Sequence, residues 1–194
     1  MPLLGMGIFI MAFRYFLALP LVLAACGGGS QVPLDVAYDQ FDTEGFRLSE
    51  RLDTFGPTLL LPRDDVRSYE GIALFTDDFV VGTDALFGDF EAEVDFGDGR
   101  LDAVSQNYVF VELDALGEPV TLQRVGGVVE YAADSLSADG FLVSANGTLF
   151  GGAGPVNVDG EMVFAFFGPD AEMLSGIGGV SFGSSNVAHT VIAD

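Results

Sequence analysis

A strict alternation of apolar and acidic residues marks the clearest strand of the chain. Over residues 90–96, phenylalanine, alanine and valine alternate with glutamate and aspartate. A strand with this pattern places one face against a core and the other in water. The Asp98-Gly99 pair that follows is a preferred hairpin turn, because both residue types tolerate a positive φ. We therefore predict a hairpin whose second strand runs over residues 100–113.

Short apolar segments separated by turn residues fill the rest of the chain after about residue 60. Turn signals stand at Asp139-Gly140, Asn146-Gly147 and Asp159-Gly160, and residue pairs of this kind mark tight turns. Further strands are predicted around them at 125–133, 141–144, 148–151, 161–167 and 179–182, and two more lie upstream of the hairpin at 69–76 and 84–86.

About eight short strands predict an all-β fold. A single antiparallel up-and-down β-barrel across roughly residues 67–183 would leave no sheet edge exposed. A two-sheet sandwich remains an alternative. Neither is expected to span a membrane, because the strands are short and their polar face carries carboxylates that could not face lipid.

Helical spacing is confined to one stretch before the strands. Leu48, Leu52 and Phe55 fall at i, i+4 and i+7, which favours a short helix or turn. Residues 27–45 show no periodicity and are interpreted as a flexible tether and irregular lead-in. The predicted organisation is a signal peptide at 1–25, a lead-in at 26–60 and a barrel domain at 61–194, with 27–60 peripheral to the barrel.

The N-terminal segment has the features of a bacterial lipoprotein leader. Residues 15–25 are apolar over a length typical of a signal-peptide core, which is too short for a membrane span. The sequence Leu23-Ala24-Ala25-Cys26 resembles a lipobox, in which the cysteine is acylated and becomes the new N-terminus. A glycine run at 27–29 would then serve as a flexible tether between the lipid and the folded domain.

Two further features of the leader bear on its processing and destination. Translation from Met11 would give a short positive region directly before the apolar core, so we expect Met11 to be the true start. A transmembrane helix over residues 3–25 is the alternative, although Arg14 and Pro20 interrupt it. Gly27, rather than aspartate, follows the cysteine and favours anchoring in the outer membrane, with exposure at the cell surface as one outcome.

Composition removes several classes of function. The chain carries 29 acidic residues against 7 basic ones and has a formal net charge of −22. Such a charge repels a phosphate backbone, so nucleic-acid binding is excluded. One cysteine cannot form an internal disulfide framework or a zinc site built on several cysteines.

The most informative segment near the C-terminus is Phe167-Gly168-Pro169, followed by Ala171-Glu172 and then Gly178-Gly179. It resembles the closing motif of the transferrin-binding protein B β-barrel family of surface lipoproteins. Leu61-Pro62 and residues 68–73 are similar to that family's approach to its first barrel strand. Met173 to Ile177 lengthen the usual spacing.

The resemblance implies an eight-stranded barrel, lipid anchoring and capture of a macromolecule or an iron source. The transferrin receptors have two lobes, whereas this chain has room for one barrel, so the ligand implied is a protein or iron-bearing molecule rather than transferrin itself. The local physics is compatible with the motif: Gly168 lets the chain leave a strand and Pro169 suits a first helical position. Asp170 and Glu172 would lie near the positive N-terminus of a short turn.

No convincing catalytic group emerges from the sequence. Asp53-Thr54-Phe55 fails the aspartic-protease pattern, and His189 lies in a polar tail where we expect it to be exposed. Asp95, Asp98 and Asp102 could gather a calcium ion, but we interpret them as turn and outer-face residues. We therefore expect no enzymatic activity, no metal and no cofactor.

The function predicted is that of a lipid-anchored binding protein at the outer membrane. Rigid strands would present loops such as 79–85 and 151–157 to a protein or iron-bearing ligand. The alternative is a structural envelope lipoprotein with no diffusible ligand.

Overall fold

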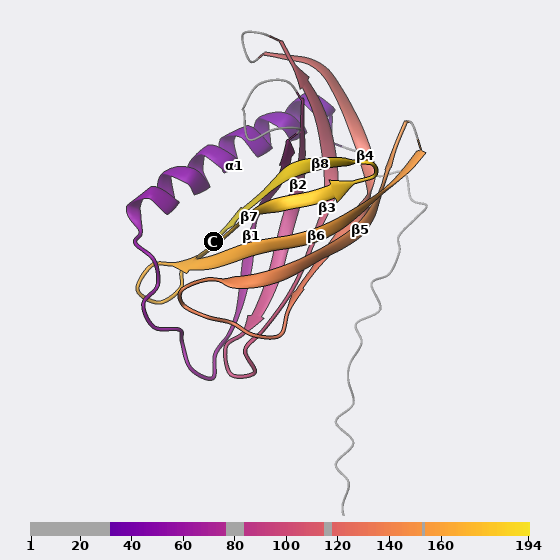
Figure 1. The fold of residues 1–194 in the computed structure, drawn as a ribbon. Helices are drawn as coiled ribbons and strands as arrows, with labels where there is room; N and C mark the ends of the chain where they lie inside the picture. Colours follow the sequence, from indigo (N-terminus) through magenta and orange to yellow (C-terminus); the bar gives the residue numbers. More distant parts are fainter. Residues whose placement is uncertain (1–31, 77–83, 115–117, 153) are drawn as a thin grey trace, which may run out of the picture. The chain divides into compact units, whose positions relative to one another are not determined.

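A closed β-barrel forms the body of the protein in a computed structural model that describes residues 32–76, 84–114, 118–152 and 154–194 (Figure 1). Each strand pairs antiparallel with the next in sequence, and the last pairs with the first, so the predicted up-and-down barrel is confirmed. The strands are β1 (Val66–Thr76), β2 (Asp84–Asp95), β3 (Arg100–Leu113), β4 (Pro119–Ala133), β5 (Phe141–Gly151), β6 (Gly154–Phe167), β7 (Met173–Phe182) and β8 (Ser185–Ala193).

The predicted hairpin is present, with Asp95 paired to Arg100 across the β2–β3 turn. Asp139-Gly140 also lies in a turn, where Gly140 has a φ of 109°.

Two of the predicted turns are wrong, because their glycines lie inside long strands. Asn146-Gly147 falls within β5, so 141–144 and 148–151 form one strand, and Asp159-Gly160 falls within β6. A Cβ atom on Gly147 would lie 2.3 Å from the carbonyl oxygen of Val128. On Gly160 it would lie 2.9 Å from the Cα atom of Val180. Glycine at these two positions allows the neighbouring strands to approach closely. Glycine therefore has a role within strands here, in addition to its role in turns.

The barrel does not end at residue 183, because the predicted polar tail is the closing strand β8. Val187, His189 and Val191 point into the barrel and are buried, while Thr190 between them is only partly buried. The expectation that His189 is exposed is therefore wrong: its side chain has no exposed surface.

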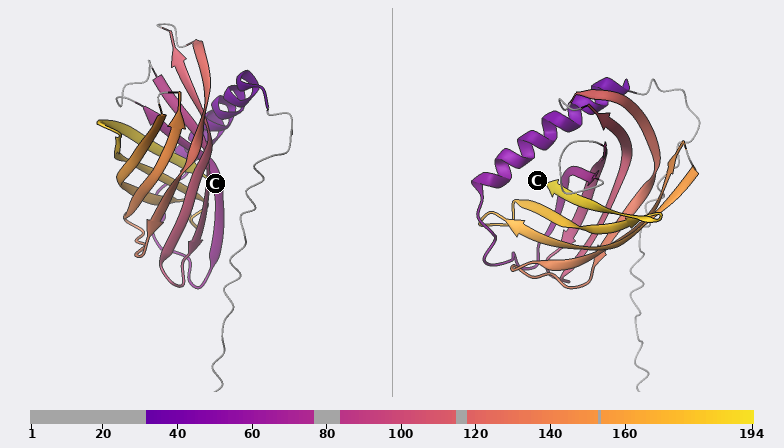
Figure 2. Two further views of the ribbon diagram at one scale, coloured as in Figure 1. Left: turned by 90° about the vertical axis from the view of Figure 1, so that its right-hand side faces the viewer. Right: turned by 45° about the horizontal axis from the view of Figure 1, so that its top comes forward.

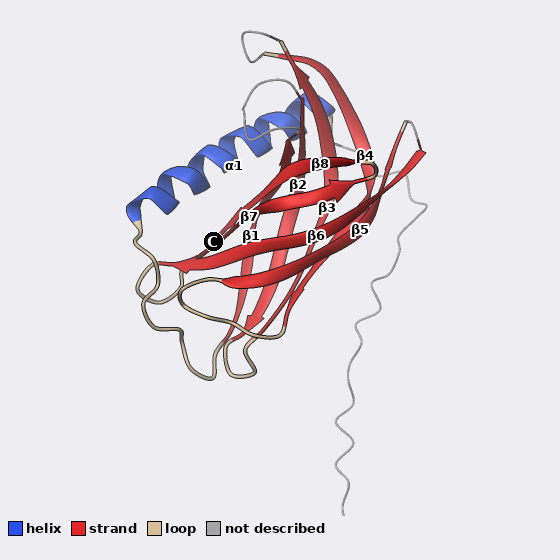
Figure 3. Cartoon of the chain, viewed as in Figure 1, coloured by secondary structure: helices blue, strands red, loops and turns tan. Residues whose placement is uncertain are grey.

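One long helix precedes the barrel and lies along its outer wall, as Figures 2 and 3 show. α1 (Leu34–Thr54) buries Ala37, Phe41 and Leu48 against outward-facing side chains of the strands. The interpretation of 27–45 as irregular is therefore wrong from Leu34 onward. Gly45 occupies the contact position where an apolar side chain would otherwise continue the stripe, with its Cβ position 3.6 Å from Cδ1 of Ile72. Among the described residues, no helix is both long and apolar enough to cross a membrane.

The segment between α1 and β1 is bonded to one end of the barrel. The Thr58 amide donates to the Phe166 carbonyl over 2.9 Å, and its hydroxyl donates to the Gly168 carbonyl over 2.7 Å. Leu61 and Phe96 pack against the core at this end, and the ring of Phe166 lies 5.1 Å from that of Phe96. Aromatic and aliphatic side chains therefore fill this end, which we call the closed end.

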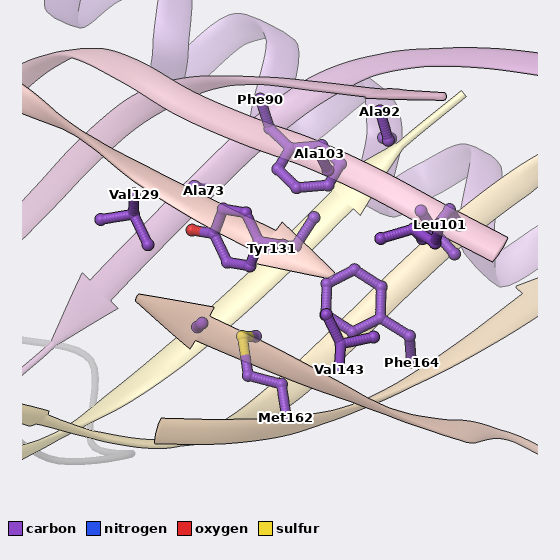
Figure 4. Packing of buried hydrophobic residues seen from close by; sticks show 14 of the residues in the cluster. Ala73, Phe90, Ala92, Leu101, Ala103, Val129, Tyr131, Val143, Met162 and Phe164 are labelled. Atoms are coloured by element: carbon purple, nitrogen blue, oxygen red, sulfur yellow. The ribbon is translucent and has the colours of Figure 1, made fainter. Parts of the chain in front are cut away.

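The middle of the barrel is filled by inward-facing aromatic rings alternating with small residues. Figure 4 shows Phe90, Tyr131 and Phe164 meeting there, and the rings of Phe90 and Tyr131 are 5.4 Å apart. The ring of Phe164 lies over Gly176 on the paired strand, where a Cβ atom would approach it to 2.4 Å. Large rings fit because glycine and alanine stand opposite them, so the middle of the barrel is a packed core.

Candidate functional site

A pocket of about 430 Å³ lies inside the barrel at the end opposite the closed end. Its apolar walls come from strand ends on all sides of the barrel: Phe75, Leu86, Phe110, Leu149, Phe182 and Val187. Gln123 and Gly152 also line it and are exposed, so the pocket reaches the surface. We call it the mouth pocket.

The predicted binding loops relate to the mouth pocket in different ways. Of 79–85, only Asp84 and Ala85 are described; they belong to β2 and line the pocket, and the remainder lies outside the described residues. The prediction of a loop at 151–157 is wrong, because most of it lies in β5 and β6 around a tight turn. Gly151, Gly152 and Gly154 nevertheless line the pocket, where the lack of side chains leaves its volume free.

The lining carries little polar chemistry. Asp84 is its one ionisable residue among the described positions, and Thr76 and Gln123 are its other polar side chains. Three phenylalanine rings face the same space, those of Phe75, Phe110 and Phe182. Binding pockets for small ligands are typically of this size and this apolar, with few polar groups.

Next to the pocket wall, four polar side chains form a buried hydrogen-bonded chain, which we call the polar chain. It consists of Ser105, Tyr108, Tyr131 and His189. Ser105 contacts the hydroxyl groups of both tyrosines, at 2.8 Å in the case of Tyr131, and Tyr131 lies 2.7 Å from Nε2 of His189. His189 Nδ1 lies 3.0 Å from the carbonyl oxygen of Leu74.

Burial determines the protonation of this chain. It lowers the pKa of His189 to about 4 and raises the pKa of Tyr108 and Tyr131, since burial disfavours every charged form. At neutral pH the imidazole is therefore uncharged. Its Nδ1 donates to the Leu74 carbonyl, so Nε2 accepts from the Tyr131 hydroxyl.

The remaining proton positions follow from the histidine. Tyr131 has used its proton and accepts from Ser105, and Ser105 accepts from Tyr108. Tyr108 therefore ends the run of donors that leads through Ser105 and Tyr131 to His189. Among the described side chains, no buried nitrogen or oxygen atom lacks a partner. Every N–H and O–H donor of the polar chain is therefore engaged within it or by the Leu74 carbonyl, and none of its four residues lines the pocket.

The polar chain is not arranged for nucleophilic catalysis. Tyr131 stands between Ser105 and His189, whereas an activated serine bonds directly to its base. Ser105 and His189 also have no exposed surface that a substrate could reach.

The residues of the closing motif lie at the closed end and in β7. Gly168 has a φ of 91°, and its amide donates to the Gly56 carbonyl over 2.9 Å. Glu172 accepts from the Asp170 amide over 3.0 Å, and the buried Ala171 accepts from the Tyr69 hydroxyl over 2.6 Å. These contacts hold a tight turn in place.

The remainder of the motif is also structural. Phe167 ends β6 and Pro169 lies in the turn, whereas Gly178 and Gly179 are within β7. A Cβ atom on Gly178 would lie 2.7 Å from the carbonyl oxygen of Glu161. The motif therefore builds the fold, and none of its residues lines the mouth pocket.

The hairpin aspartates serve as turn and surface residues, as interpreted from the sequence. Asp95 accepts from the amides of Gly97 and Asp98, and Asp102 pairs with Arg100. Where residues are described, no three histidine, cysteine or acidic side chains gather around a common point. Cys26 and the preceding Leu23, Ala24 and Ala25 lie outside the described residues.

Comparison with known proteins adds no relative from which a function could be transferred. No family model matches the chain, and no curated protein is significantly similar to it.

The sequence did not indicate the mouth pocket. Phenylalanines are most often core residues, and nothing in the sequence distinguishes those of the lining from the others. The available signal was the Gly-Gly-Ala-Gly run at 151–154, which removes side chains from one part of the wall.

Proposed function

We propose that this protein is a lipid-anchored binding protein of the bacterial envelope that holds its ligand at the mouth end of the barrel. The observation that carries the proposal is the difference between the two ends. One is filled by side chains such as Leu61 and Phe166, and the other contains an apolar pocket of about 430 Å³. An apolar concavity on a rigid scaffold is the usual form of a binding site.

The first class of ligand is a protein or an iron-bearing molecule captured at the strand ends around the mouth. The resemblance to transferrin-binding protein B barrels supports this class. After cleavage before Cys26, six arginines and 29 acids would remain, a side-chain charge of −23. Such a surface attracts basic partners, and about 0.5 M salt should weaken their capture.

The alternative is a structural envelope lipoprotein, and one surface feature favours it. Leu142, Val163 and Ile177 lie opposite one another on β5, β6 and β7. All three side chains are at least half exposed. This apolar row would suit a permanent neighbour in the envelope rather than a diffusible ligand.

Lipid anchoring is tested by Cys26→Ala. The variant should lose incorporation of labelled fatty acid and accumulate as unprocessed precursor, because the thiol is the acyl acceptor. Normal processing and labelling of this variant would remove the anchoring proposal.

Capture is tested by offering serum and the cell's own envelope proteins to the mature chain. Asp84→Asn combined with Gln123→Ala should reduce specific capture, because both residues line the mouth pocket. Asp159→Asn on the exposed outer wall is the matched control and should leave capture unchanged. Capture that persists in the mouth variant, or the absence of any specific partner, would favour the structural alternative.

A further inference from the structure

We propose that the mouth pocket binds a compact, uncharged apolar molecule about two to three times the size of benzene and discriminates against anions of the same shape. The inference deepens the proposed function by naming a ligand class for the mouth end. The inference rests on the proposed function in one respect: both place the ligand at the mouth end of the barrel.

The volume sets the size of the ligand. An apolar cavity of about 150 Å³ in another protein accommodates benzene, and the mouth pocket is close to three times larger, at about 430 Å³. It also falls within the range of about 300–1,000 Å³ in which small ligands are usually bound. A molecule of two or three fused or linked rings therefore matches the space.

The walls are rigid as well as apolar. Phe75 is buried between the imidazole of His189, which stacks on it at 3.7 Å, and the ring of Tyr108 at 6.0 Å. The ring of Phe182 also packs against that of Phe75, with the ring centroids 6.2 Å apart. A wall held by four aromatic groups does not need to be ordered by the ligand, which lowers the free-energy cost of binding.

The polar chain beside the wall excludes ligands that need a polar partner deep in the pocket. Its donors are all engaged by one another or by the Leu74 carbonyl, and its four residues are buried behind the pocket lining. A polar group buried without a partner loses its hydration uncompensated. The inner part of the ligand should therefore be wholly apolar.

Charge excludes anionic ligands. Asp84 is the ionisable residue of the described lining, and none of the basic side chains belongs to it. The whole chain has a formal net charge of −22. An anionic group at the mouth would meet a carboxylate at short range and an acidic protein at long range, both of which are repulsive.

The experiment compares two fluorescent probes with the same ring skeleton. N-phenyl-1-naphthylamine is neutral, and 8-anilino-1-naphthalenesulfonate adds a sulfonate. Both are titrated into residues 26–194 carrying Cys26→Ala, which has no acyl chain to absorb the probe. The neutral probe should saturate at one molecule per chain and bind at least about tenfold more tightly than the anion.

Two matched pairs of variants locate the binding. Val156→Trp fills the pocket and should abolish binding of the neutral probe, whereas Val163→Trp places the same ring on the outer wall of the same strand and should not. Asp84→Lys should strengthen binding of the anionic probe, whereas Asp159→Lys makes the same change in net charge away from the pocket. The Asp84→Lys result does not depend on whether Val156→Trp folds.

Several results would overturn the proposal: equal affinity for the two probes, equal effects of the two tryptophan variants, or equal effects of the two lysine variants. Probe binding without macromolecular capture would retain this inference and remove the capture proposal. Capture by a chain that binds neither probe would do the reverse.

Discussion

The imidazole of His189 lies flat against the phenyl ring of Phe75, with ring centroids 3.7 Å apart and planes 7° from parallel. Both ring nitrogens are engaged at the same time, by the Tyr131 hydroxyl and the Leu74 carbonyl. A protonated imidazole would have two donors, so Tyr131 would have to accept from Nε2 and the hydrogen bonds to Ser105 and Tyr108 would have to reverse. The neutral ring is therefore built into the interior of the barrel.

We expect the stability of the barrel to depend on pH through His189. Its pKa is about 4 in the folded chain, against 6.5 for an ordinary histidine. As the pH falls below 6.5, the unfolded state takes up the proton first. The contribution of the neutral His189 to the free energy of unfolding is complete above pH 6.5. It decreases as the pH falls toward 4, by about 3 kcal/mol in total.

His189→Gln isolates this contribution from the titration of the many carboxylates. Chemical denaturation of both proteins between pH 4 and 7 should show a smaller loss of unfolding free energy in the variant. Parallel curves for the two proteins would contradict the assignment of a neutral buried histidine.

Tyr131→Phe should destabilise the barrel by about 1–3 kcal/mol, because it leaves buried polar groups without partners. Tyr131 is the central member of the polar chain and bonds to both Ser105 and His189. Tyr108→Phe, at the end of the chain, should cost less. The unfolding free energies of Tyr131→Phe, His189→Gln and the double variant are measured by urea denaturation. The loss in the double variant should differ from the sum of the two single losses. Additive costs would mean that the four groups do not act as one network.

Gly168→Ala should destabilise the closed end by about 1–2 kcal/mol, the cost of placing a side chain in a left-handed conformation. Gly168 has a φ of 91°, and a Cβ atom would approach Oε2 of Glu172 to 2.0 Å. Gly56 is the matched control, because its carbonyl accepts the Gly168 amide and no atom lies near its Cβ position. Thermal denaturation should therefore find Gly56→Ala close to neutral, and equal losses in both variants would be against the argument.

Leu48→Ala should cost about 2–5 kcal/mol, as for other fully buried leucines. Leu48 has no exposed surface, whereas Phe46 on the same helix is 66% exposed. Phe46→Ala should therefore stay within about 0.5 kcal/mol of the parent protein, although it removes a larger side chain. The same free energies of unfolding for both variants would mean that α1 does not dock on the barrel as described.

The sequence predicts the strands of the barrel well where one face of a strand is exposed to solvent and the other is buried. The alternation over residues 90–96 located β2 and its turn into β3, because the acids between the apolar residues face water. Glycine is harder to interpret. The sequence Asn146-Gly147 is typical of a hairpin turn. The structure shows that Gly147 is instead needed inside β5, because a side chain there would clash with the backbone of β4.

β8 was missed and α1 was predicted only at its C-terminal end, around Leu48 and Leu52, because their partners lie far away in the sequence. β8 places a histidine among its inward positions, which is tolerable only because Tyr131 and Leu74 provide hydrogen-bond partners. The apolar stripe of α1 is interrupted by Gly45, which fits because Ile72 fills the space beside it. For the same reason a local pattern indicates only one part of the mouth pocket, the glycines near residue 152, because the rest of its lining comes from many strands.

The closure of the barrel depends on a single pairing between strands that are far apart in the sequence. Among the strands that the structure describes, every pairing except one joins neighbours in sequence, and such local pairings form at a low entropic cost. The exception is the seam between β1 and β8, which joins Gly71 to Ala193. β8 also carries His189, so its arrival completes the wall and the polar chain in the same event. Without β8, the facing edges of β1 and β7 would have no partner strand, so the last strand removes both free edges of the sheet.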